Sequence, residues 1–196
     1  MAWLETGVRR RSYHVGNLRA QLLDEARALL ESGGLSQLNL RALAARAGIA
    51  PGSVYHHYAS KQALLAGLAA AGFGELEAAL RAASGGDATP IRTCAQAYFD
   101  FAQAQPALYA LMFDPPVLAV PEVDAARVRA FEVLEDVIAG SPTQSDRDSR
   151  TIHQIALAVW ACGHGAASMT LADPADGEGR LMDEVIAGLE ALFRRR

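Results

Sequence analysis

Two histidines and two tyrosines fill four consecutive positions, Tyr55 to Tyr58, in a chain of 196 residues that is otherwise rich in Ala and Leu. Imidazole and phenol groups form hydrogen bonds with phosphate oxygens and with the edges of bases. The small residues Pro51, Gly52 and Ser53 precede them, and a helix that begins with small residues can approach a partner closely. The free N–H groups and positive dipole end of such a helix favour an anion. The pattern therefore predicts contact with nucleic acid.

The adjacent residues His56 and His57 could instead suggest a metal site. Neighbouring side chains on a helix point about 100° apart, as a turn of about 3.6 residues requires, so the two imidazoles cannot chelate one ion. The two cysteines, Cys94 and Cys162, are far apart in the sequence and belong to no CxxC pair, which favours free thiols over a disulfide or a metal centre. We therefore expect neither a metal ion nor another cofactor.

Short helices must position these residues. The chain is expected to be helical nearly throughout, because Ala and Leu dominate it and no alternating β-branched runs occur. Asn39 is a natural N-cap, and Gly48 separates two short helices joined by the sequence AGIA, which is a helix-turn-helix pattern. In such units the second helix lies in the major groove of DNA. The predicted helices are 15–32, which SGG at 32–34 ends, then 39–46, 51–59, 61–82, 91–104, 107–113, 122–139, 147–171 and 178–194.

The small N-terminal unit needs a core of its own. Val54 and Tyr58 lie four positions apart and share a helix face, so we assign both to that core. Tyr55 is ambiguous, because its ring could pack while its hydroxyl still reaches a phosphate. A three-helix packing unit with a polar surface and no ligand remains the alternative. The other expected core members are Leu40, Leu43 and Ile49.

The net charge of −4 hides an asymmetry along the chain. Residues 1–61 carry eight Lys and Arg against four Asp and Glu, a charge of +4, so the other 135 residues sum to −8. A basic N-terminal part on an acidic body suggests that the first meets a polyanion and that the second serves another purpose.

Other functional classes find little support in the sequence. It holds no nucleophile elbow, no HExxH and no phosphate-binding loop, so we do not expect an enzyme. No apolar run reaches the roughly 18 residues that span a bilayer, and no apolar stretch follows the arginines near the N-terminus. We therefore expect a cytoplasmic protein without a membrane partner. A helical adaptor with no role on DNA stays open as the other alternative.

The segment LSQLNLRALAARAGIAPGSVYHHYASKQALL, within residues 16–68, closely resembles the DNA-binding domain of TetR/AcrR-type bacterial transcriptional repressors. The order of features carries the resemblance: a short helix, Ala-Gly-Ile, a helix start of small residues, an aromatic core, then Ser-Lys and Leu-Leu. One departure is Tyr58, where phenylalanine is commoner in the family. The resemblance implies DNA contacts by Asn39, Arg41, Pro51, Gly52, Ser53, Tyr55, His56, His57 and Lys61.

Two later segments, QPALYALMFD (105–114) and AVWACGHGAASM (158–169), are similar to the TetR subgroup whose ligand domain is named for Trp, His and Gly. The resemblance implies a regulatory pocket within residues 90–170, and such pockets are mostly apolar with a few polar anchors. Each large residue there can singly belong to the core instead, and His164, the expected anchor, can equally be a hydrogen-bonded core histidine. The predicted pocket residues are Tyr98, Phe101, Tyr109, Met112, Phe113, Trp160, His164 and Met169.

The resemblance also implies a homodimer built on the helices at 147–171 and 178–194. An apolar stripe in each helix favours this interface, although packing within one protomer explains such stripes as well. The stripe residues are Ile152, Ile155, Ala156, Val159, Cys162 and Gly163 in the first helix and Leu181, Val185, Ile186, Leu189, Leu192 and Phe193 in the second.

The expected architecture is all-α, with an N-terminal three-helix helix-turn-helix DNA-binding domain, a larger C-terminal helical bundle and about nine helices. Its divisions are a flexible arm at 1–14, the helix-turn-helix domain at 15–61, a connecting helix at 62–82, and a ligand-binding and dimerisation domain at 83–196. The expected function is a DNA-binding transcriptional regulator, a repressor that binds a palindromic operator as a homodimer. A small apolar or aromatic ligand is expected to release it by shifting the helices at 91–113, which tilt the connecting helix.

Overall fold

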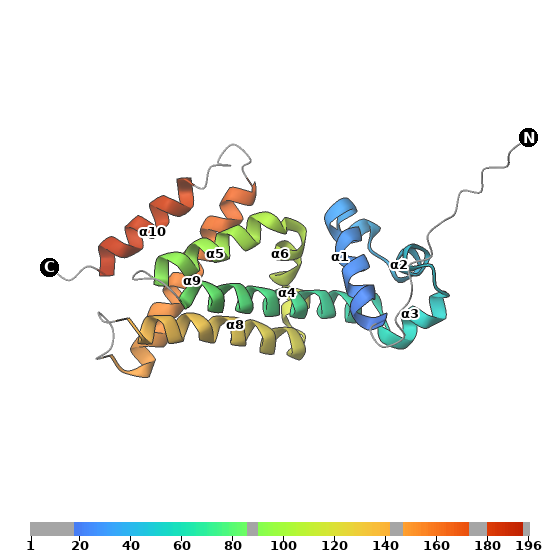
Figure 1. Cartoon of the computed structure of the whole chain (residues 1–196), viewed down its shortest axis with the longest axis horizontal. Coiled ribbons are helices and arrows are strands. Elements are labelled where there is room, and N and C mark those ends of the chain that lie inside the picture. The colour runs from blue at the N-terminus through green and yellow to red at the C-terminus, as the bar shows by residue number, and fades with distance from the viewer. Residues whose placement is uncertain (1–17, 86–89, 142–146, 173–179, 194–196) are drawn as a thin grey trace, which may run out of the picture.

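The computed structural model describes residues 18–85, 90–141, 147–172 and 180–193. These ranges form ten helices and contain no strand, which confirms the expected all-α fold (Figure 1). The predicted arm at 1–14 lies outside the described residues. The helices are α1 (Leu18–Gln37), α2 (Leu40–Ala47), α3 (Pro51–His57), α4 (Lys61–Ser84), α5 (Pro90–Ala104), α6 (Pro106–Met112), α7 (Pro115–Leu118), α8 (Pro121–Ala139), α9 (Ser149–Ala172) and α10 (Arg180–Phe193).

Local signals set the boundaries of the first helices. Gly34 has φ 68° and ψ −175°, so the helical backbone of α1 breaks within one residue of the predicted stop. The Asn39 side chain caps α2 by accepting a hydrogen bond from the Ala42 N–H at 2.8 Å. Gly48 ends α2 in the left-handed conformation, with φ 67°, which a glycine adopts without steric cost. α2 and α3 therefore form the expected helix-turn-helix.

The sequence predicts no helix between those at 107–113 and 122–139, whereas the structure has the short helix α7 there. Proline at its first position is already restricted to a helical φ, and the Asp114 carbonyl accepts hydrogen bonds from the N–H groups of Val117 and Leu118, both at 2.9 Å. The Val117 side chain is buried against the main core, so tertiary packing holds a single turn that local pattern alone would not predict.

The long helix α4 leaves the small N-terminal unit and enters the body, where it runs beside α8 (Figure 1). It packs against α5, α6, α7 and α8, and also against α1. The helix that the sequence predicted as a connection is thus the central helix of the body. At Gly72 it lies so close to α6 that an added Cβ would stand 2.7 Å from the Met112 sulfur.

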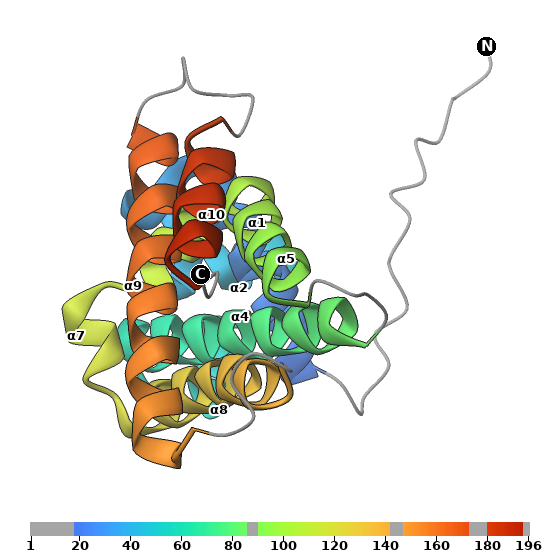
Figure 2. The same cartoon turned by 90° about the vertical axis from the view of Figure 1, so that its left-hand side faces the viewer.

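The helices α9 and α10 lie side by side and cross α4 and α8 steeply (Figure 2). Most residues of the predicted dimer stripes pack within the protomer, which is the alternative interpretation of these stripes, whereas Cys162 is exposed. Ala156 and Val159 are buried, and Ile152 and Ile155 pack against a core cluster around Phe131. On α10, Ile186 is buried, and Leu181, Val185 and Leu189 pack on the core; the side chains of Leu192 and Phe193 lie outside the described residues.

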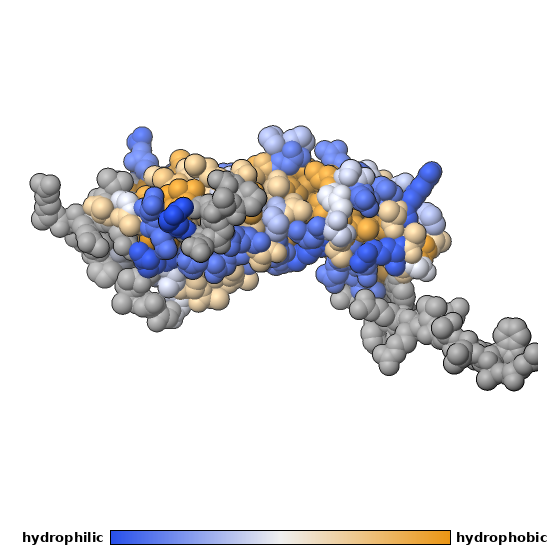
Figure 3. All heavy atoms as spheres, turned by 90° about the horizontal axis from the view of Figure 1, so that it is seen from above, coloured by the Kyte–Doolittle hydropathy of each residue, from blue (hydrophilic) through white to orange (hydrophobic). Residues whose placement is uncertain are grey.

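The opposite face of α9 is exposed and is also apolar. Leu157 is 54% exposed and Met169 62%, and the small residues Ala158, Ala161 and Cys162 are exposed between them. Seen from above, the surface of the molecule carries hydrophobic residues (orange) that are exposed among hydrophilic ones (blue) (Figure 3). Among the described residues, α4 and α9 are long and apolar enough to cross a membrane by length and composition alone, but both are packed as bundle helices here.

Candidate nucleic-acid interface and ligand cavity

The helix α3 has one buried face and one exposed face. Val54 is fully buried and Tyr58, which follows the helix, is 2% exposed, so their assignment to the core is confirmed. Tyr55 is 49% exposed, so its side chain lies at the surface rather than in the core. Of the nine residues predicted to contact DNA, Ser53 is partly buried and the other eight are exposed: Asn39, Arg41, Pro51, Gly52, Tyr55, His56, His57 and Lys61.

Tyr58 anchors this helix to its neighbours. Its hydroxyl donates to the Arg19 carbonyl of α1 at 3.3 Å, and the Arg19 guanidinium lies 5.2 Å from the centre of its ring. The ring also lies against Gly67 of α4, where an added Cβ would stand 3.1 Å from Cε1. Burial raises the pKa of the phenol, so the hydroxyl stays a donor. Tyr58, which stands where phenylalanine is commoner in the family, therefore has a hydrogen-bond partner, the Arg19 carbonyl, for its hydroxyl.

Two of the predicted phosphate contacts already have partners within the protein. The Lys61 ammonium, at the start of α4, donates to the Leu35 carbonyl at 2.8 Å, beyond the break at Gly34. The Asn39 amide donates to the Gln37 carbonyl at 3.3 Å while its oxygen caps α2. An ammonium has three donors, so Lys61 can keep this bond and still meet a phosphate.

Aromatic rings form a continuous chain through the body, each in contact with the next. Along it, the distance between ring centres is 5.4 Å from Phe73 to Phe113, 5.0 Å from Phe113 to Tyr109 and 5.9 Å from Tyr109 to Tyr98. The chain continues from Tyr98 to Trp160 at 5.3 Å, then to Phe131 and His153, with His164 packed on Phe113 at 4.1 Å. Edge and tilted contacts of this kind stabilise the packing beyond their buried area. The predicted pocket residues in this chain are Tyr98, Tyr109, Phe113, Trp160 and His164.

A polar cluster lies within this chain. The Tyr109 hydroxyl stands 2.7 Å from His164 Nδ1, and the Tyr98 hydroxyl stands 3.1 Å from that of Tyr109. Burial raises the pKa of Tyr109 to about 12 and that of Tyr98 still further, whereas burial lowers the pKa of His164. Both phenols are therefore protonated at neutral pH and the imidazole is neutral. The Tyr98 hydroxyl also stands 3.4 Å from Nδ1, so the two hydroxyls and the imidazole form one hydrogen-bonded cluster.

A small cavity of about 40 Å³ opens beside this cluster. Its polar groups are few: the Tyr98 hydroxyl is already hydrogen-bonded with that of Tyr109, and the Cys94 thiol, whose pKa burial raises to about 11, donates to the Leu80 carbonyl. No charged side chain lines it among the described residues. Five helices supply its walls: Leu80 from α4; Ile91, Cys94, Ala95 and Tyr98 from α5; Leu134 from α8; Val159, Trp160 and Gly163 from α9; and Met182, Val185, Ile186 and Leu189 from α10.

Of the eight predicted pocket residues, only Tyr98 and Trp160 line the cavity. Tyr109, Phe113 and His164 lie beyond Tyr98 in the aromatic chain, Phe101 and Met112 are buried in the core, and Met169 is 62% exposed on the outer face of α9. The other wall residues, among them the whole α10 wall and Leu134, were not predicted, because nothing in their own segments distinguishes a cavity wall from an ordinary core face. Among the described residues, no group of His, Cys, Asp and Glu could hold a metal ion.

The buried imidazole makes stability depend on pH. Because burial lowers the pKa of His164 in the fold, the unfolded chain binds a proton more readily than the folded one when the pH falls below the ordinary histidine value of 6.5. The stability that comes from keeping this imidazole neutral is therefore complete above pH 6.5 and is lost as the pH decreases. We expect His164→Gln to lose less stability than the wild type between about pH 7.5 and 5.5 in urea titrations at fixed protomer concentration. Equal losses in both proteins would contradict this assignment.

Residues 22–68 match the family model described as "Bacterial regulatory proteins, tetR family". Residues 91–192, more than half of the chain, match the model described as "Tetracyclin repressor-like, C-terminal domain". The chain belongs to the TetR family. It is a TetR-family transcription regulator with a helix-turn-helix DNA-binding domain, and members of this family typically bind a small molecule in the C-terminal domain.

Solved structures agree with membership of the TetR family. A protein of unknown function from Rhodococcus sp. RHA1 is 31% identical, with a TM-score of 0.78, and the match covers 94% of this chain and 97% of that one. PfmR, a TetR family transcriptional regulator from Thermus thermophilus, has 21% identity and a TM-score of 0.62 over 90% of this chain and 100% of that one. Such TetR-family regulators are typically not enzymes.

A third relative carries a ligand. A single-residue variant of TetR from Acinetobacter baumannii AYE, in complex with minocycline, is 19% identical, with a TM-score of 0.61 over 90% of this chain and 98% of that one. Among curated proteins, none matches the chain. None of these relatives and models confirms the resemblance to the Trp-His-Gly subgroup, which stays a prediction within the TetR family.

Proposed function

We propose that the chain is a repressor that binds a palindromic DNA operator as a homodimer and releases it when a small neutral molecule, apolar or aromatic, binds in the C-terminal domain. The observation that carries the proposal is the two-faced helix α3. Val54 and Tyr58 fasten it to the core, while the polar side chains of Tyr55, His56 and His57 are exposed. A bacterial regulator of this kind acts on the chromosome, so the proposed location is the cytoplasm.

The proposed contacts divide into two kinds. Asn39, Arg41 and Lys61 lie where helices begin and would hold phosphates, which position a protein without reading sequence. Tyr55, His56 and His57 would meet base edges in the major groove. The small residues Pro51, Gly52 and Ser53 would let the start of α3 approach the duplex.

The proposed dimer uses the outer faces of α9 and α10. On α9 the apolar residues Leu157 and Met169 are exposed with small residues between them, and on α10 Ala187 and Gly188 are exposed. Small residues let two helices pack closely, and burial of the exposed apolar side chains would stabilise the pair. A two-fold dimer can place two recognition helices about 34–36 Å apart, one turn of DNA.

The proposed ligand is neutral because the cavity wall offers no charged partner among the described residues, and burial of an unpaired charge is costly. Its apolar part would contact Trp160, Met182 and Ile186, and one hydrogen-bonding group would face the cluster of Tyr98, Tyr109 and His164. The minocycline bound by the Acinetobacter relative supports an effector site in this fold, although not the same ligand.

The size of the cavity supports a coupled mechanism. An apolar cavity of about 150 Å³ binds benzene, whereas this one measures about 40 Å³, so a ring-sized ligand must push its helices apart. A ligand that binds only the expanded form shifts the population towards that form. If the expanded form holds the two α3 helices at another spacing, DNA affinity falls, with a coupling of about 1–3 kcal/mol.

One experiment tests both parts of the proposal. Duplexes that bind the protein are first selected from a random pool, and binding is then titrated by fluorescence anisotropy. We expect a palindrome to be enriched; recovery of no preferred sequence would overturn the repressor assignment. Indole and p-cresol, as neutral probes, are expected to raise the thermal midpoint and weaken DNA binding, whereas benzoate and benzylammonium are not. A response to the charged probes alone would overturn the ligand class.

Lys61→Ala and His57→Ala separate the two kinds of DNA contact. We expect Lys61→Ala to weaken binding to every duplex and to lower the slope of log affinity against log salt by about 0.9, the value for one lost phosphate contact. His57→Ala is expected to keep the slope and to change which bases are preferred at one position, by about 1–3 kcal/mol. Selections and salt titrations measure both effects. Identical behaviour of the two variants would contradict this division of roles.

A further inference from the structure

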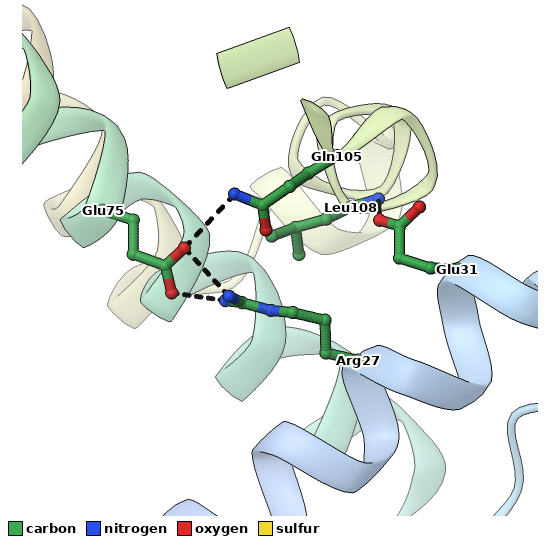
Figure 4. A network of polar contacts seen from close by, with 5 residues as sticks. All are labelled: Arg27, Glu31, Glu75, Gln105 and Leu108. Carbon is green, nitrogen blue, oxygen red and sulfur yellow. Dashed lines mark hydrogen bonds and ion pairs between the residues drawn. The ribbon is translucent and has the colours of Figure 1, made fainter. Parts of the chain in front are cut away.

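The helix α6 of the body takes its N-terminal cap from the DNA-binding domain. Its own preceding residue, Gln105, makes no capping bond with its side chain, and Pro106 has no N–H. The Glu31 carboxylate of α1 accepts a hydrogen bond from the N–H group of Leu108 at 2.9 Å (Figure 4). It also accepts one from the N–H group of Ala107 at 3.3 Å. A carboxylate at the positive end of a helix satisfies these free donors and is electrostatically favourable.

A second contact joins the same face of α1 to α4. Arg27 lies one turn before Glu31, and its Nη1 donates to Glu75 Oε2 at 2.9 Å while Nη2 donates to Oε1 at 2.5 Å (Figure 4). A two-point contact between planar groups fixes orientation as well as distance. The Gln105 amide also donates to Oε2, at 3.5 Å. We name Arg27, Glu31, Glu75, Gln105 and Leu108 the junction network.

The junction network is connected to the ligand cavity through α6. Tyr109, the residue after Leu108, has its hydroxyl 3.1 Å from that of Tyr98, which lines the cavity, and 2.7 Å from Nδ1 of His164 on α9. Met112, at the end of α6, packs against Gly72 of α4. The helix has only seven residues, so Leu108, Tyr109 and Met112 all lie within two turns of one another. A change of the cavity that displaces Tyr109 therefore displaces the N–H groups that Glu31 holds.

We propose that Glu31 and Arg27 are positioning residues that hold the DNA-binding domain at one orientation against the body. This inference rests on the proposed DNA-binding function. It adds a second route between the cavity and α3, through α6 and α1, beside the route through α4. The two side chains make no contact with DNA in this scheme; they set where α3 stands.

Binding to a palindrome is the property that such positioning controls. When one half of a dimer is bound, the other half binds its half-site at an effective concentration that depends on the spacing of the two domains. Domains released from the body spend less time at the correct spacing. A single half-site needs only one domain, so its affinity does not depend on that spacing.

Glu31→Ala tests the proposal, with Asp24→Ala as the matched control. Asp24 lies on α1 seven residues before Glu31, is exposed and takes no part in the junction network. Binding is measured on a palindrome selected by the wild type and on one half-site of it. We expect Glu31→Ala to weaken palindrome binding about fivefold or more, while half-site binding stays within about twofold. The control should keep the wild-type ratio of the two affinities.

The outcomes separate this inference from the proposed function. If the wild type selects no duplex, both fail. If the wild type binds a palindrome and Glu31→Ala keeps or raises the wild-type ratio, the junction proposal alone fails. Loss of half-site binding as well would reveal a folding defect and would shift the decision to Glu31→Gln, which retains an acceptor oxygen without the charge. The ratio for Glu31→Gln must fall between those of Glu31→Ala and wild type, and a ratio at the wild-type value overturns the proposal.

Discussion

Gly52→Glu is expected to abolish operator binding while leaving the fold intact. Gly52 is exposed at the start of α3, and an added Cβ there would meet no atom within 4 Å, so the protomer has room for any side chain. A carboxylate in the first turn of a helix also favours the helix. On the duplex the same carboxylate would face phosphates, and like charges brought together cost several kcal/mol, so we expect a loss of about 100-fold or more. Anisotropy titration measures it.

Gly74→Glu provides the control for this experiment. Gly74 of α4 also has open space around its Cβ position, and it lies in the body rather than on α3. Both variants should match or exceed the wild-type thermal midpoint, because glycine is a poor helix former. Only Gly52→Glu should lose DNA binding. Retention of full affinity in Gly52→Glu would mean that another surface meets the duplex.

Gly163→Leu is expected to make the protein insensitive to the effector. Gly163 lines the cavity, and an added Cβ would meet no atom within 4 Å. A leucine there occupies the space of about 40 Å³ that a ligand would have to enlarge, and it also replaces a poor helix former. DNA binding should stay at the wild-type level. A ligand found by thermal shift should bind at least about tenfold more weakly, because overpacking the site costs about 1–3 kcal/mol.

Gly163→Ala separates the two contributions. It brings the same gain in helix propensity as the leucine but fills only a methyl group of the cavity. We expect it to be stabilised while still responding to the ligand. Calorimetry of ligand binding and anisotropy on the operator give the comparison. An unchanged ligand response in Gly163→Leu would place the effector site elsewhere.

The features that were predictable from the sequence are those fixed by neighbouring residues. Asn39 caps a donor three residues away, and Gly48 ends α2 by its own backbone freedom. Val54 and Tyr58 could be assigned to the core because a four-residue spacing defines a helix face. These rules depend on local geometry alone, and the resemblance to the TetR family rests on the same segment.

The features that were not predictable depend on distant partners. Both faces of α9 are apolar, with Ala156 and Val159 on the inner one and Leu157 and Met169 on the outer one. Hydrophobicity therefore could not decide which face the protomer itself covers, and packing within the protomer and a dimer interface both stayed open for the predicted stripe. The bond from Leu108 to Glu31 joins residues 77 positions apart, so no pattern along the chain could reveal it.

The position of Trp160 gives the protein a built-in optical reporter. The sequence holds two tryptophans, Trp3 and Trp160, and replacement of Trp3 by phenylalanine would leave one tryptophan, which can be excited apart from the tyrosines at long wavelength. That indole lies on the cavity wall between the rings of Tyr98 and Phe131. Any molecule entering the space would alter the polarity and quenching that the excited ring experiences. Its emission spectrum can therefore follow occupancy in real time, without a dye and without knowledge of the operator.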